Sequence, residues 1–114
     1  MSPSKPTAAP LAMIDIAPWG DEIKAQRTTA LFKSSQMEVI RMALPSGKEI
    51  PEHKAPGEIT VQCLEGRIEF CAAGQVSVLR GGQMLYVLAG VPHSLRALDD
   101  SSMLLTIVRT GAMQ

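Results

Sequence analysis

Between residues 28 and 109 the chain is a succession of short segments in which apolar and polar residues alternate, separated by glycine or proline turns. In Gln36–Leu44, for example, one face carries Ile40, Met42 and Leu44. An alternation of period two is typical of a strand with one buried face. Many such strands at close spacing predict an all-β fold, a barrel or a sandwich, before any motif is considered.

The strands that we expect from this pattern are Thr28–Lys33, Gln36–Leu44, Ile50–Lys54, Ile59–Cys63, Ile68–Ala72, Gln75–Leu79, Met84–Leu88, His93–Ala97 and Met103–Arg109. Gly66 is expected to turn a hairpin, and both Gly66 and Gly82 are expected to take a positive φ. Met84–Leu88 is apolar throughout, which indicates a strand buried on both faces or one that pairs at a barrel seam. A short edge strand is expected at Leu11–Ile16.

A chain of 114 residues has the size of one domain. We divide it into an N-terminal arm over residues 1–20, extended or flexible apart from its possible edge strand, and a barrel over residues 21–114. The arm begins with a proline-rich stretch, Met1–Pro10, which is typical of disordered or extended chain. Trp19 is the only tryptophan, and we expect it to anchor the arm on the barrel or on a partner subunit.

Charge and hydropathy exclude several partners. Eleven basic residues balance eleven acidic ones, so nothing in the charge favours nucleic acid or an anionic membrane. No apolar run is long enough to span a membrane, and the first residues do not resemble a signal peptide. The expected location is the cytoplasm. Cys63 and Cys71 are not expected to face one another across the predicted hairpin, so we predict two buried free thiols.

Two stretches hold both histidines of the chain, residues 47–66 with His53 and residues 82–97 with His93. Together they resemble the two signature motifs of the cupin superfamily, the RmlC-like proteins. The positions that match are Gly47, His53, Gly66, Gly82, Gly90 and His93. The resemblance implies an antiparallel β-barrel of the cupin type, a double-stranded β-helix or jelly-roll, and it covers residues 37–108.

Four positions differ from the family's motifs, and two of them, Ala55 and Ile59, are positions that usually bind a metal ion in the family. Ala55 stands at the second histidine and Ile59 at the glutamate of the first motif, while Leu88 and Ala97 replace a proline and an asparagine in the second. Of the four usual ligands only His53 and His93 remain. The resemblance therefore implies a fold but does not specify an activity, because one fold supports many chemistries.

These substitutions leave three functions open. The leading prediction is a binding protein with a metal-poor barrel pocket for a small molecule, lined by His53, Ile59, Val61 and His93. The alternative is a metal-dependent enzyme of the dioxygenase or isomerase type, with a divalent transition metal on His53, His93 and a substitute ligand. A third is a metal-free acid–base enzyme, in which a histidine moves the proton on a polar or carbohydrate substrate.

Glu58 is the first candidate for the substitute metal ligand, since it lies one residue before the family's glutamate position. A slip of one residue reverses the face of a regular strand, so Glu58 reaches the histidines only if a bulge or a shifted turn re-aims it. The simpler interpretation is an exposed glutamate near a turn.

The chain is also expected to form a homodimer. Leu11, Met13, Ile14 and Ile16 have no evident place inside a barrel that the later strands already fill. Burying them against a second copy would cover both an apolar patch and an open sheet edge. The other possibility is that the arm folds back on its own barrel.

Overall fold

The computed structural model describes residues 8–109, which form nine strands and one short 3-10 helix. The elements are η1 Gly20–Ala25, β1 Thr29–Lys33, β2 Met37–Leu44, β3 Glu49–His53, β4 Ile59–Glu65, β5 Arg67–Ala72, β6 Gln75–Arg80, β7 Met84–Val87, β8 His93–Ala97 and β9 Ser101–Val108. The predicted all-β fold is confirmed. Within the described part of the chain, no helix is long and apolar enough to cross a membrane.

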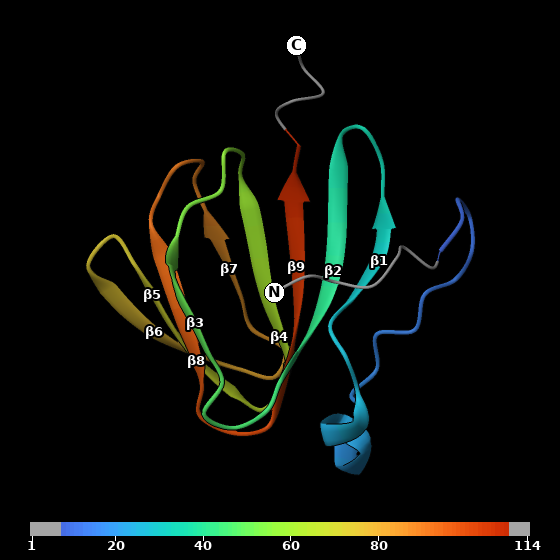
Figure 1. The fold of residues 1–114 in the computed structure, drawn as a ribbon, viewed down its shortest axis with the longest axis horizontal. Coiled ribbons are helices and arrows are strands. Elements are labelled where there is room, and N and C mark those ends of the chain that lie inside the picture. The colour runs from blue at the N-terminus through green and yellow to red at the C-terminus, as the bar shows by residue number, and fades with distance from the viewer. Residues whose placement is uncertain (1–7, 110–114) are drawn as a thin grey trace.

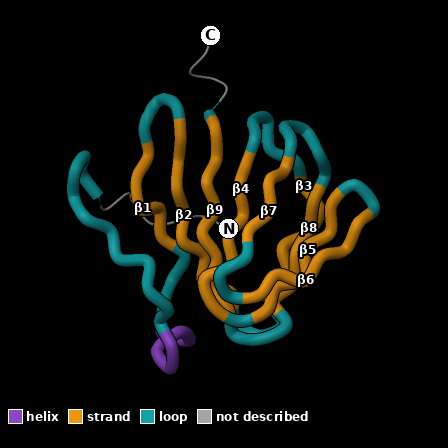
Figure 2. Tube along the Cα trace, turned by 180° about the vertical axis from the view of Figure 1, so that it is seen from behind, coloured by secondary structure: helices purple, strands orange, loops and turns teal. Residues whose placement is uncertain are grey.

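The strands make two antiparallel sheets that face each other, as in a jelly-roll (Figure 1). One sheet has five strands in the order β1-β2-β9-β4-β7, and the other has four in the order β3-β8-β5-β6. Seen from behind, the arm runs as loop outside β1, and η1 lies at one end of the molecule (Figure 2). The sheets themselves therefore enclose the interior.

Alternation decides which side chains fill the space between the sheets. Leu44 on β2, Val61 on β4, Ile68 on β5 and Met103 on β9 are all 1% exposed or less. The predicted inward faces of β2, β4 and β8 are confirmed, since their apolar residues belong to one buried cluster. Burying such side chains is the main favourable term in the stability of a small barrel.

The predicted hairpin at Gly66 is wrong. Gly66 joins β4 to β5, but β4 pairs with β7 and β9 while β5 pairs with β6 and β8. The glycine turns a corner from one sheet into the other, with φ at 86°. A tight glycine turn can join neighbouring strands of one sheet or strands of two different sheets, so the sequence could not distinguish a hairpin from a corner. Cys63 and Cys71 consequently lie in different sheets, and both are free thiols, but only Cys63 is buried as expected, whereas Cys71 is half-buried.

Two further expectations differ from the structure. Strand β7 is an edge strand that pairs only with β4, and the outward side chains of Met84 and Tyr86 are 56% and 60% exposed. It is therefore not buried on both faces, because no element covers the outer side of the sheet there. Leu11–Ile16 forms no strand. Its neighbour Ala8 makes a single backbone hydrogen bond to Leu31 on β1.

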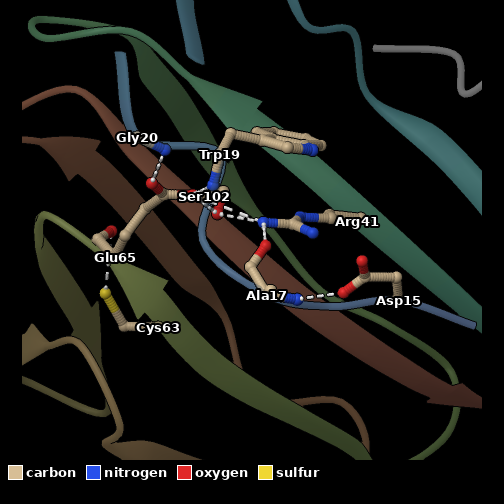
Figure 3. A network of polar contacts seen from close by, with 8 residues as sticks. All are labelled: Asp15, Ala17, Trp19, Gly20, Arg41, Cys63, Glu65 and Ser102. Carbon is tan, nitrogen blue, oxygen red and sulfur yellow. Dashed lines mark hydrogen bonds and ion pairs between the residues drawn. The ribbon is translucent and has the colours of Figure 1, made fainter. Parts of the chain in front are cut away.

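The arm is fixed to the five-stranded sheet by a polar cluster that we call the clasp, formed by Trp19, Arg41, Glu65 and Ser102 (Figure 3). The Trp19 ring lies 3.8 Å from the Arg41 guanidinium carbon, so Trp19 anchors the arm on its own barrel. Arg41 points outward from β2, yet it is only 3% exposed because the arm covers it.

Glu65 is the centre of the clasp. Its carboxylate accepts hydrogen bonds from the Trp19 backbone N–H at 2.9 Å and from the Ser102 hydroxyl at 2.6 Å, and Arg41 Nη2 lies 3.3 Å away. Burial acts to raise the pKa of Glu65, but these hydrogen bonds, one from Gly20 N–H and the charge of Arg41 together hold it below its usual range. Glu65 therefore stays ionised and tethers the arm.

Candidate functional site

A cavity of about 380 Å³ lies between the two sheets. Its apolar walls come from both of them, with Ile40, Met42, Ile59 and Val61 on the five-stranded sheet and Phe70 and Leu95 on the four-stranded one. Both histidines also line it. The alternation of the strands aims these side chains inward, and the separation of the sheets leaves the space unfilled.

The two histidines come together at this cavity from neighbouring strands. His53 is the last residue of β3 and His93 the first of β8, and the two are register partners. Their ring centroids are 4.4 Å apart, with the ring planes at 62°. His93 also stacks on Phe70, at 5.6 Å and 13°. His93 is only 4% exposed, whereas His53 lies exposed at the rim.

A backbone carbonyl two residues earlier fixes each ring. His53 Nδ1 donates to the Pro51 carbonyl at 3.1 Å, and His93 Nδ1 donates to the Val91 carbonyl at 2.9 Å. A carbonyl oxygen only accepts, so the Nδ1 atom carries the proton in the neutral ring. Each Nε2 then presents a lone pair, and neither Nε2 has a hydrogen-bond partner among residues 8–109.

The four residues that the sequence indicated for a pocket, His53, Ile59, Val61 and His93, all line this cavity. Ile59 and Val61 are 4% and 1% exposed, so they form solid apolar wall. The side of the cavity where the family's motif has a carboxylate is therefore hydrocarbon.

Glu58 lies elsewhere. It is exposed, it does not line the cavity, and its carboxylate accepts a hydrogen bond from the Tyr86 hydroxyl on the edge strand β7. That hydrogen bond raises the pKa of Tyr86. Within the part of the chain that the structure describes, the one carboxylate on the cavity lining is that of Glu52, an exposed residue at the rim.

The donor set does not fit a complete metal site. No three His, Cys, Asp or Glu side chains of the described residues come close enough together to hold a metal ion. Catalytic zinc usually takes three protein ligands, and only the two imidazoles meet here. Cys63 cannot serve as a third ligand, because it is buried in the core and burial raises the pKa of its thiol.

Sequence reasoning missed part of the lining, namely Thr28, Phe70, Leu95, Met103 and Leu105. Phe70, Leu95, Met103 and Leu105 lie on strands, and the alternation of apolar and polar residues there indicates that they face inward. This alternation was the signal that the sequence offered. Which inward-facing residues meet around a cavity depends on the order of strands in the sheets, and no local pattern encodes that order. The clasp was missed for the same reason, apart from Trp19.

Comparisons with protein families and with solved structures show what this chain is similar to. The sequence model of the family described as "Cupin domain" matches residues 40–109. No curated protein matches the chain in a sequence search. A conserved protein of unknown function from Streptococcus pyogenes has a similar structure, with 29% identity and a TM-score of 0.68, over 72% of each chain.

Two other solved structures widen the comparison. An RmlC-like cupin from Desulfovibrio desulfuricans is 25% identical with a TM-score of 0.70, over 86% of this chain and 97% of that one. Salicylate 1,2-dioxygenase from Pseudoaminobacter salicylatoxidans, solved as adducts with gentisate, is 23% identical with a TM-score of 0.63. That match covers 69% of this chain and 21% of the dioxygenase, and it concerns the fold alone.

Proposed function

The chain belongs to the cupin family, and from that premise we propose that it binds a small molecule in the cavity between its two sheets. The observation that carries the proposal is a cavity of about 380 Å³ with apolar walls and two imidazoles whose Nε2 atoms have no partner among the described residues. Ligand pockets are typically apolar clefts of roughly 300–1,000 Å³ with a few placed polar groups.

A metal-dependent enzyme of the dioxygenase or isomerase type remains the second candidate, with His53 and His93 as ligands. One observation favours it: histidines that ligate metals usually donate their other ring N–H to a carbonyl or carboxylate, as both do here. The missing third donor counts against it. Elemental analysis of protein purified without added metal separates the two, because near-stoichiometric transition metal would favour the enzyme.

A third use of the histidines, as acid or base without a metal, has less support. A proton-transferring group must lie within hydrogen-bond reach of the substrate, and besides the histidines only Thr28 and Glu52 among the described lining residues have polar side chains for binding a sugar. The buried lining is mostly hydrocarbon.

The binding proposal is tested with N-phenyl-1-naphthylamine, an uncharged dye whose fluorescence rises in apolar surroundings. We expect saturable binding of one dye per chain. Ile59→Phe fills the cavity from β4 and should weaken binding at least about tenfold, which corresponds to about 1.4 kcal/mol.

The matched control is Val78→Phe on the outer face of β6, where the side chain is 42% exposed. It adds the same ring outside the cavity and should leave binding unchanged. Dye binding that both variants preserve equally would place the ligand elsewhere and contradict the proposal. Thermal unfolding of each variant checks that it is folded.

The proposal also includes the location of the protein in the cell and its partners. Free thiols persist in a reducing compartment, so the two free thiols of this chain favour a location in the cytoplasm. The partner expected besides the small molecule is a second copy of the chain, because apolar side chains of the arm remain exposed. Neither nucleic acid nor a membrane is proposed as a partner, since the formal net charge is zero.

A further inference from the structure

We propose that the ligand of this cavity is an uncharged, largely apolar molecule that carries an O–H or N–H donor, as a phenol does. This inference rests on the proposed function and specifies its ligand class. It follows from the hydrogen bonds that the two imidazoles make, from the burial of His93 and from the charged groups on the cavity lining.

The hydrogen bonds of the imidazoles define what they can offer. Because both Nδ1 atoms donate to backbone carbonyls, the Nε2 atoms of the neutral rings can only accept. A ligand that presents another acceptor, such as an ether or ketone oxygen, gains nothing from them. A ligand with a donor satisfies at least one of two acceptors whose rings lie 4.4 Å apart.

The need for a donor is greatest at His93. Its side chain is 4% exposed, and its Nε2 has no partner among the described residues. His93 lines the cavity, so a ligand that covered its Nε2 without offering a donor would leave that acceptor unpaired and out of water, which is costly.

Charge on the lining excludes the commonest alternative, an organic anion. Among residues 8–109, no lysine or arginine lines the cavity, and the one carboxylate on its lining is that of Glu52 at the rim. A carboxylate ligand would lose its hydration without meeting a positive partner, which is expensive in apolar surroundings. The apolar walls thus favour a neutral molecule.

Three probes with one ring system test the inference on the intact chain: 2-naphthol, 2-methoxynaphthalene and 2-naphthoate. At about pH 8, wild-type protein should bind 2-naphthol about fivefold or more tightly than the methyl ether, because one net hydrogen bond differs. The carboxylate should bind weakest. His93→Phe keeps an aromatic ring without Nε2, and it should reduce the preference for the naphthol over its ether, because only the acceptor on His53 then remains.

The outcomes separate this inference from the function on which it depends. If none of the probes binds, the cavity is not a binding site and both proposals fail. If the ether or the carboxylate binds as tightly as the naphthol, only the ligand class is wrong. Nitrogen-15 spectra of labelled histidine provide a readout without a variant: they should show Nδ1–H rings in the free protein and a naphthol-dependent shift of His93 Nε2. A protonated Nε2 in the free protein would overturn the inference.

Discussion

Each histidine in the cavity has its ring held by a carbonyl two residues earlier, within the same short stretch of chain. Pro51 accepts from His53 and Val91 accepts from His93. This local geometry makes the pair acceptors toward the cavity. Their presence near one pocket was predictable from the motif spacing, whereas the orientation of the rings was not, because it depends on backbone conformation that the residue types alone do not fix.

Glu65 provides a prediction at the same scale. Its pKa is held down in the folded protein, so its contribution to stability is complete above the ordinary glutamate pKa of about 4.3 and is lost as the pH falls below it. We expect Glu65→Gln to destabilise the protein by about 1–3 kcal/mol at pH 7, because Arg41 then lacks its counter-charge. The difference from wild type should shrink below about pH 4.

Urea unfolding between pH 3 and pH 7 measures this difference. The matched control is Glu22→Gln on η1, an exposed glutamate outside the clasp. A Glu65→Gln cost that stays constant across the range would show that the carboxylate charge contributes nothing to holding the arm.

At the scale of elements, alternation located the buried faces of β2, β4 and β8, and glycines located the turns. The partner of each strand was harder to predict. The sequence predicts a hairpin at Gly66, yet a short glycine turn between two strands fits a hairpin and a corner equally well. The apolar run of β7 had the same ambiguity: a strand with hydrophobic residues on both faces can lie in the centre of a sheet or at an uncovered edge.

The corner at Gly66 can be tested against Gly82. Both have positive φ, at 86° and 92°. A Cβ added at Gly66 would lie 2.2 Å from Ser101 Oγ and 2.5 Å from the Asp100 carbonyl, whereas nothing lies within 4 Å at Gly82. Gly82→Ala should therefore cost about 1 kcal/mol of unfolding free energy through φ strain alone. Gly66→Ala should cost at least about 1 kcal/mol more, as overpacking is added. Equal costs in urea unfolding would refute the corner packing.

The edge position of β7 makes a second prediction. Met84 points outward and is 56% exposed, whereas Val87 points inward and is 6% exposed. Replacing Met84 with threonine should change the unfolding free energy by less than about 0.5 kcal/mol. Val87→Thr should destabilise by about 1–2 kcal/mol because it buries a hydroxyl. Thermal and urea unfolding compare the two, and a large cost for Met84→Thr would indicate that β7 is covered on its outer side.

For the molecule as a whole, two facing sheets enclose a partly empty interior, and a polar clasp fixes the arm across the outside of one sheet (Figures 1 and 3). Alternation predicted the strands, and the glycines and histidines of the two motifs predicted the family. The clasp depends on residues far apart in the sequence, such as Arg41 and Glu65. Such long-range pairs leave no local pattern from which to predict them.

The homodimer is a prediction at this scale. The clasp holds the arm at Trp19, yet Leu11 and Met13 are fully exposed. We expect the full chain to be a dimer by light scattering, with these side chains covered by the second copy. Replacing Leu11 and Met13 together with serine keeps the clasp and should yield a monomer. If the full chain is monomeric at high concentration the prediction is wrong, and if the double variant stays dimeric the interface lies on the barrel.

The central claim, that the space between the sheets is a binding site, is tested most directly by mapping where a ligand binds. Backbone amide spectra of nitrogen-15-labelled protein, titrated with N-phenyl-1-naphthylamine, report each residue separately. The account predicts saturable shifts around Ile40, His53, Ile59 and His93, with little change at Val76 and Val78 on the outer face of β6. Shifts confined to the outer faces of the sheets, with the cavity residues unmoved at saturation, would contradict it.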